Sequence, residues 1–166
     1  AGRKRGLLTE LFAKPEFTER QKRYNRALGY RGPYTPQVIY SGYLHGPGTS
    51  IARIEPNFAK RDITPYPAGV AFEGDTVSIS GALPAKVSKA SVVVVRFRPG
   101  QTKVTPAGGT NKGKAMTYWN LVTGFETLGE WKGGTQKFAA KCDRGCVVLV
   151  QKEGAEGAII GVAQKK

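Results

Sequence analysis

From residue 65 onward, glycine and proline clusters divide the sequence into short β-prone runs. Antiparallel sandwiches are typically built from such strands, with turn residues between them at this spacing. The chain contains 22 glycines and 10 prolines, which suits a fold with many turns. We therefore expect an antiparallel β-sandwich-like domain over residues 65–166. Its candidate strands are residues 77–80, 91–97, 117–122, 136–140, 147–151 and 158–163.

The first long stretch with helix start and stop signals covers residues 15–29, and it predicts a helix there. Pro15 suits the first helical position, Glu16 suits the positive end of the helix dipole, and Gly29 suits the end of the helix. Apolar side chains fall on one face of this helix, and the opposite face is basic. We expect the basic face to be exposed and to bind a partner through Arg20, Arg23 and Arg26. The alternative is a solvated surface that has no partner.

Two further elements are predicted before the sandwich. Residues 37–41 are β-prone, and residues 49–61 are compatible with a helix that Pro56 shortens or kinks. The proline-rich segment 62–69 then marks a boundary, after which the pattern changes to strands. The chain is therefore predicted to be α+β, with one unit over residues 1–64 and a second over residues 65–166.

The charge of the chain is strongly positive and unevenly distributed. The net charge is +14, and residues 76–125 contain no acidic side chain. Such a field concentrates polyanions and acidic surfaces near the protein. We expect the partner to be an acidic protein or an anionic membrane surface, although charge that serves only solubility is the alternative. Nucleic acid is a less favoured partner. Exposed aromatic platforms that stack on bases would indicate it, but most aromatic residues here lie within apolar patterns.

The sequence contains no recognisable catalytic constellation. His45 is the single histidine, and it lies in a glycine- and proline-rich stretch without a nucleophile or metal ligand near it in sequence. There is no paired-carboxylate pattern, no zinc-ligand spacing and no phosphate-binding loop motif. We therefore expect no catalytic, cofactor-binding or metal-binding residues, and we favour a binding protein over an enzyme.

The two cysteines of the chain, Cys142 and Cys146, lie between two β-prone runs. A hairpin with a three-residue loop would place them opposite one another, at a separation that a disulfide can bridge. We expect a structural disulfide, which implies an oxidising compartment. Free thiols are the alternative, and the spacing is not the C-x-x-C of redox-active pairs.

Several ordered motifs resemble the DUF1223 family of bacterial secreted, thioredoxin-like proteins of uncharacterised function. The resemblance extends from about residue 10 to the end of the chain. It rests on residues 16–24 (EFTERQKRY), 34–42 (YTPQVIYSG), 111–113 (NKG) with 118–122 (YWNLV), 128–131 (LGEW), 147–151 (VVLVQ) and 157–163 (GAIIGVA).

The resemblance implies a partial thioredoxin-like α/β unit over residues 1–64, followed by the β-sandwich-like unit. In thioredoxin-like folds a Thr-Pro pair before a strand usually contains a cis-proline, so Thr35–Pro36 is expected to be cis. Family members begin with a strand and a Cys-x-x-Cys helix start, and this chain has neither. Thr110 stands where the family has a glutamate, and this difference weakens the inference of a functional site in that loop.

These observations predict a non-catalytic accessory or scaffold protein that binds an acidic protein or an anionic surface, as a subunit of a larger assembly. A periplasmic or secreted location is expected, with membrane association but no transmembrane span. One alternative is a thiol–disulfide oxidoreductase whose redox half is missing from this chain. Another is a protein that binds nucleic acid or another polyanion.

Overall fold

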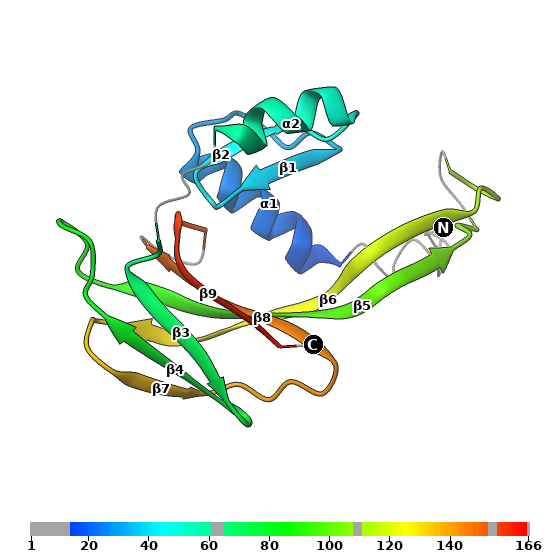
Figure 1. Cartoon of the computed structure of the whole chain (residues 1–166). Helices are drawn as coiled ribbons and strands as arrows, with labels where there is room; N and C mark the ends of the chain where they lie inside the picture. Colours follow the sequence, from blue (N-terminus) through cyan, green and yellow to red (C-terminus); the bar gives the residue numbers. More distant parts are fainter. Residues whose placement is uncertain (1–13, 61–64, 108–110, 153–155, 166) are drawn as a thin grey trace, which may run out of the picture.

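The computed structural model describes residues 14–60, 65–107, 111–152 and 156–165, which form two helices and nine strands (Figure 1). The strands form three antiparallel sheets of two, three and four strands. The predicted α+β class is therefore confirmed. The predicted domain boundary falls at residues 61–64, which lie outside the described residues, so it stays a prediction. The thioredoxin-like character of the first unit also stays a prediction.

The first unit contains a helix, a hairpin and a second helix. Its elements are α1 (Pro15–Ala27), β1 (Gln37–Tyr40), β2 (Leu44–Pro47) and α2 (Ile51–Ala59). The buried Asn25 connects α1 to the hairpin. Its side-chain amide donates to the carbonyl of Gly32 at 3.1 Å, and its Oδ1 accepts from Gln37 at 2.7 Å. A polar side chain is tolerated here because both ends of its amide are hydrogen-bonded.

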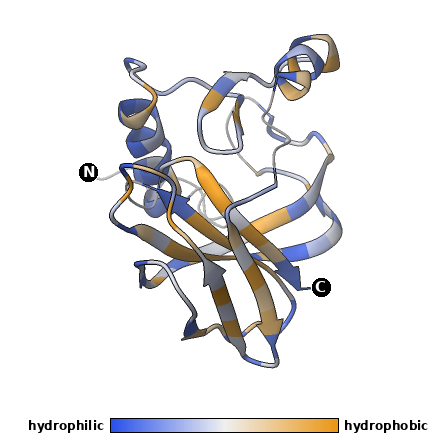
Figure 2. Ribbon diagram, turned by 60° about the vertical axis from the view of Figure 1, so that its left-hand side comes forward, coloured by the Kyte–Doolittle hydropathy of each residue, from blue (hydrophilic) through white to orange (hydrophobic). Residues whose placement is uncertain are grey.

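The second unit is a sandwich of two sheets, with strand orders β3-β4-β7 and β6-β5-β8-β9. Val77 and Ile79 of the smaller sheet belong to one buried cluster with Val92, Val94 and Val148 of the larger sheet. Figure 2 shows hydrophobic residues along the strands of both sheets and mostly hydrophilic residues along α1. The strands are β3 (Ala68–Glu73), β4 (Thr76–Gly81), β5 (Ala90–Val104), β6 (Met116–Trp131), β7 (Gln136–Ala139), β8 (Gly145–Lys152) and β9 (Ile159–Lys165).

Close approach of β3 to β9 joins the two sheets at one edge. A Cβ atom built on Gly161 would lie 2.8 Å from both the Cβ and the carbonyl oxygen of Ala68. No ordinary side chain fits at that distance, so this contact depends on glycine.

Helix α1 lies over the other face of the larger sheet (Figure 1). The ring of Phe17 packs against that of Phe125 on β6, with 6.0 Å between centroids. The hydroxyl of Tyr24 accepts a hydrogen bond from the buried Gln151 of β8 at 3.0 Å. The first unit is thus packed on the sandwich through α1.

The structure differs from the sequence prediction in four strands. Strand β3 was missed, and β2 lies where a glycine- and proline-rich loop was expected, so His45 is a strand residue. Strands β5 and β6 are 15 and 16 residues long, well beyond the predicted runs 91–97 and 117–122. Alternation and turn residues identified the buried parts of these strands, but exposed strand ends carry no hydrophobic pattern.

Candidate anion-binding surface

A two-stranded ribbon extends from the sandwich (Figure 1). We define the ribbon as residues 98–104 of β5 and 116–121 of β6, which pair with each other. Strand β8 pairs with β5 only as far as Phe97, so the ribbon has no third strand among the described residues. Among the described residues, both edges of the ribbon are therefore unpaired.

The exposed ribbon side chains are basic and aromatic. Gln101 pairs with Trp119, and Lys103 pairs with Thr117 two positions further along, so these four side chains share one face. The side chain of Trp119 is 67% exposed, the largest exposed fraction of any described aromatic side chain. Lys112 and Lys114, in the connection between the strands, are also exposed. One face therefore combines a tryptophan with a lysine, and further lysines follow near the tip.

A bulge at the base of the ribbon sets its direction. The pairing shifts between Arg98 and Gln101, and Asn120 opposite has a φ of 48°. Its side-chain oxygen accepts a hydrogen bond from the backbone amide of Gly100 at 3.1 Å. Asparagine tolerates positive φ better than most residues, which explains why it stands at this position. Bulges of this type re-aim the strands that follow them.

Arginines line a cavity of about 280 Å³ at the base of the ribbon. Val92, Val94 and Arg96 alternate along one face of β5, so Arg96 follows the core at the open end of the sandwich. Arg96 is paired with Glu126 at 3.0 Å. The guanidinium groups of Arg98 and Arg144 form no ion pair with any described residue. The residues around the cavity are Arg96, Phe97, Arg98, Thr123, Cys142, Asp143, Arg144 and Gly145.

A disulfide between Cys142 and Cys146 closes the loop that carries Arg144, as the sequence predicts. The two Cα atoms are 5.9 Å apart, within the range that a disulfide spans. Cys146 is fully buried in the sandwich core, whereas Arg144 is exposed. The bond therefore anchors an exposed arginine loop to the core.

The expected exposure of the basic face on α1 is wrong for Arg20, whereas partner binding by Arg20, Arg23 and Arg26 stays a prediction. The side chain of Arg20 is only 12% exposed and donates to the buried Gln151 at 2.9 Å, and its guanidinium lies 4.9 Å from the ring centroid of Phe125. Arg23 is half-exposed, and its Nε pairs with Glu156 at 2.8 Å. Arg26 alone of the three is exposed. This face of α1 therefore largely contacts the sandwich. Its partners there, Gln151 and Glu156, lie far from α1 in the sequence.

The Thr35–Pro36 peptide bond is cis, the geometry that the family resemblance implies. The carbonyl of Pro36 accepts from the amide of Gly48 at 2.9 Å, next to the β1–β2 hairpin. Nearby, the hydroxyl of Tyr34 lies 2.8 Å from Nδ1 of His45. Burial, followed by the neighbouring Tyr30, raises the pKa of Tyr34 above its usual value. His45 thus belongs to an aromatic cluster in the first unit, far from the ribbon.

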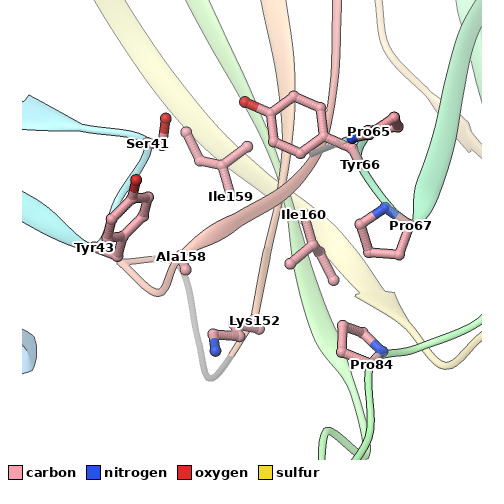
Figure 3. A pocket seen from close by; sticks show the side chains of 10 residues that line it. All are labelled: Ser41, Tyr43, Pro65, Tyr66, Pro67, Pro84, Lys152, Ala158, Ile159 and Ile160. Atoms are coloured by element: carbon pink, nitrogen blue, oxygen red, sulfur yellow. The ribbon is translucent and has the colours of Figure 1, made fainter. Parts of the chain in front are cut away.

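A second cavity, of about 450 Å³, lies beside β9 (Figure 3). It is bounded mainly by Ile159, Ile160 and three prolines, with the side chain of Lys152 at one side. Most of the side chains that line it are apolar or aromatic, so its walls suit an apolar group more than a charged one.

Within the described residues, no group of three or more histidine, cysteine, aspartate or glutamate side chains is arranged to hold a metal ion. Neither described helix has the length and apolar composition that crossing a membrane requires.

Fold and surface together define an α+β protein whose sandwich carries a basic, aromatic ribbon. A model of the DUF1223 family, a protein family of unknown function, matches residues 9–154. The chain therefore belongs to the DUF1223 family.

A crystal structure of protein AGR_C_4864 from Agrobacterium tumefaciens is similar, with 33% sequence identity and a TM-score of 0.69. The alignment covers 92% of this chain and 71% of that chain. No curated protein matches the chain.

Sequence reasoning missed Trp119, Arg98 and Arg144 as surface residues of interest. The acid-free stretch 76–125 contains the whole ribbon. What the sequence could not show is that Arg98 and Arg144, 46 positions apart (144 − 98), line one cavity.

Proposed function

We propose that this protein is a non-catalytic accessory protein whose ribbon binds an anionic membrane surface. The observation that carries this proposal is the composition of the ribbon and its tip. Lys103, Lys112 and Lys114 are exposed there together with Trp119, and no acidic residue occurs between Asp75 and Glu126.

The residue types fit the chemistry of such a surface. Tryptophan is favoured at the boundary between lipid and water, where its ring is apolar and its N–H is solvated. Each lysine close to an anionic leaflet contributes about 1 kcal/mol of attraction, which salt screens. Because the ribbon edges expose unpaired backbone groups, the ribbon would lie in the interface and not enter the hydrocarbon core.

The disulfide supports a periplasmic or secreted location, since such bonds persist in oxidising compartments. Nucleic acid is scarce in that setting, whereas anionic lipid is available. This favours a membrane surface over a nucleic acid as the partner of the ribbon. Membership in a larger assembly remains part of the proposal, with the ribbon as its attachment to the membrane.

The test is sedimentation of the protein with vesicles of phosphatidylcholine alone or mixed with phosphatidylglycerol. We expect binding only to the mixed vesicles, and weaker binding at about 500 mM than at about 50 mM salt, because screening shortens the reach of exposed charges. Emission from Trp119 should shift to shorter wavelength on binding, while the fully buried Trp131 stays unchanged.

The ribbon variant carries Lys103→Gln, Lys112→Gln and Lys114→Gln. We expect its affinity to fall about a hundredfold at low salt, from about 1 kcal/mol per lysine. The control carries Lys60→Gln, Lys86→Gln and Lys132→Gln, which removes the same charge from exposed sites outside the ribbon. Equal losses in the two variants, or binding to neither vesicle, would reject the proposal. An acidic protein partner would then be the better explanation of the ribbon.

A further inference from the structure

The arginine-lined cavity at the base of the ribbon is a second feature with an evident chemical preference. It forms where β8 begins at Gly145 and β5 continues beyond Phe97 without that partner. Gly145 is required there, because a Cβ would lie 2.7 Å from the ring of Phe97 and from Pro99. The small residue thus allows Phe97 and Pro99 to pack closely beside the cavity that Arg96, Arg98 and Arg144 line.

The charges around the cavity favour an anion. Three arginines and one acidic residue, Asp143, line the cavity, and the carboxylate of Asp143 has the ammonium group of Lys141 at 3.7 Å. Arg96 is already paired with Glu126, so Arg98 and Arg144 are the two groups available for a ligand. Planar guanidinium groups bind phosphate oxygens through paired N–H donors, a geometry that lysine does not offer.

The disulfide holds one of these two arginines in place. Arg144 lies in the loop that the Cys142–Cys146 bond closes, and Arg98 lies on β5. A loop fixed before binding loses less conformational freedom when a ligand arrives. The cavity is therefore preorganised on one side by a covalent bond and on the other by the sheet.

We infer that this cavity binds the phosphate of an anionic phospholipid headgroup, through Arg98 and Arg144. The inference rests on the proposed membrane-binding function and adds a specific headgroup site beside the ribbon. The ribbon would supply general attraction to the surface, and the cavity would recognise the phosphate group.

The test uses a double variant, Arg98→Gln with Arg144→Gln, in the full chain. Both side chains are exposed, so the sandwich core is unaffected. We expect affinity for vesicles with phosphatidylglycerol to fall about tenfold. The matched control, Lys60→Gln with Lys132→Gln, loses the same charge and should fall no more than about twofold. Soluble glycerol 1-phosphate should compete with the vesicles for the wild type but not for the double variant.

Separate outcomes test the site and the function. Equal affinity of the double variant and its control would overturn the headgroup site, even if the ribbon lysines prove essential. If the wild type ignores vesicles but titration calorimetry detects glycerol 1-phosphate only when both arginines are present, the membrane function fails and the phosphate site stands. Binding of inorganic phosphate as tight as that of glycerol 1-phosphate would overturn the assignment to a headgroup.

Discussion

Arg20 of α1 donates a hydrogen bond of 2.9 Å to Gln151, a fully buried side chain near the end of β8. Gln151 in turn donates to Tyr24 and to the carbonyl of Gly157, so its amide is satisfied on both sides. Two of the hydrogen bonds of the Gln151 amide therefore come from residues of α1. The buried amide stays satisfied only while α1 packs on the sheet.

Replacing Arg20 by alanine should lower the free energy of unfolding by about 2 kcal/mol, because the buried oxygen of Gln151 loses a charged donor. Urea unfolding of the full chain measures this change. Arg26→Ala is the control, since Arg26 is exposed on the same helix and should change stability by less than about 0.5 kcal/mol. Equal effects of the two substitutions would mean that the Arg20 contact contributes nothing to stability.

Gly161→Ala should destabilise the joint between β3 and β9. The added methyl group would lie 2.8 Å from the backbone oxygen of Ala68, which cannot move without shifting β3. Overpacking of this kind costs about 1–3 kcal/mol, which a thermal melt can measure. Gly124→Ala in β6 is the matched control, because nothing lies within 4 Å of its added Cβ. A Gly161 variant as stable as this control would contradict the close approach of the two strands.

Reduction of the Cys142–Cys146 disulfide should lower the free energy of unfolding by about 2 kcal/mol, the loop-closure value for so short a loop. The chain has only these two cysteines, so a reductant acts at no other thiol pair. Urea unfolding with and without a phosphine reductant measures the difference. The double substitution Cys142→Ala with Cys146→Ala is the control, and it should be insensitive to the reductant.

The phenol of Tyr34 should titrate above its usual value of 10, because burial raises its pKa. The unfolded chain then releases this proton first, so the contribution of Tyr34 to stability is complete below the unfolded pKa and is lost as pH rises through the folded pKa. Ultraviolet titration of the wild type minus Tyr34→Phe isolates this group. A difference curve centred at or below pH 10 would contradict the prediction.

The elements that the sequence predicted are those with a strong local signal. Pro15 and Gly29 identified α1 closely, and β-branched runs identified the buried parts of β5 and β8. The cysteine spacing correctly predicted the disulfide, but the hairpin that the prediction assumed is wrong, because β7 pairs with β4 whereas β8 pairs with β5 and β9. In each case the deciding physics acts between residues close in sequence.

The orientation of the α1 arginines was not predictable in the same way. A basic helix face is usually solvated, and Glu156, which pairs with Arg20 and Arg23, lies more than 130 positions away. Which surface meets that face is decided by tertiary packing, and a single sequence does not contain that information explicitly. The same reason explains why the Arg98–Arg144 cavity was missed.

The ribbon also sets a distance. Its β5 part adds seven residues beyond Phe97, and a strand rises about 3.3 Å per residue, so the tip stands about 23 Å from the end of the β5–β8 pairing. Because β5 continues from the core through the bulge into the ribbon, the ribbon acts as a spacer of fixed length. Deleting two residues from each of the two ribbon strands would shorten the spacer by about 7 Å. Every core contact would stay in place. The distance between the tip of the ribbon and the sandwich is thus encoded in strand length.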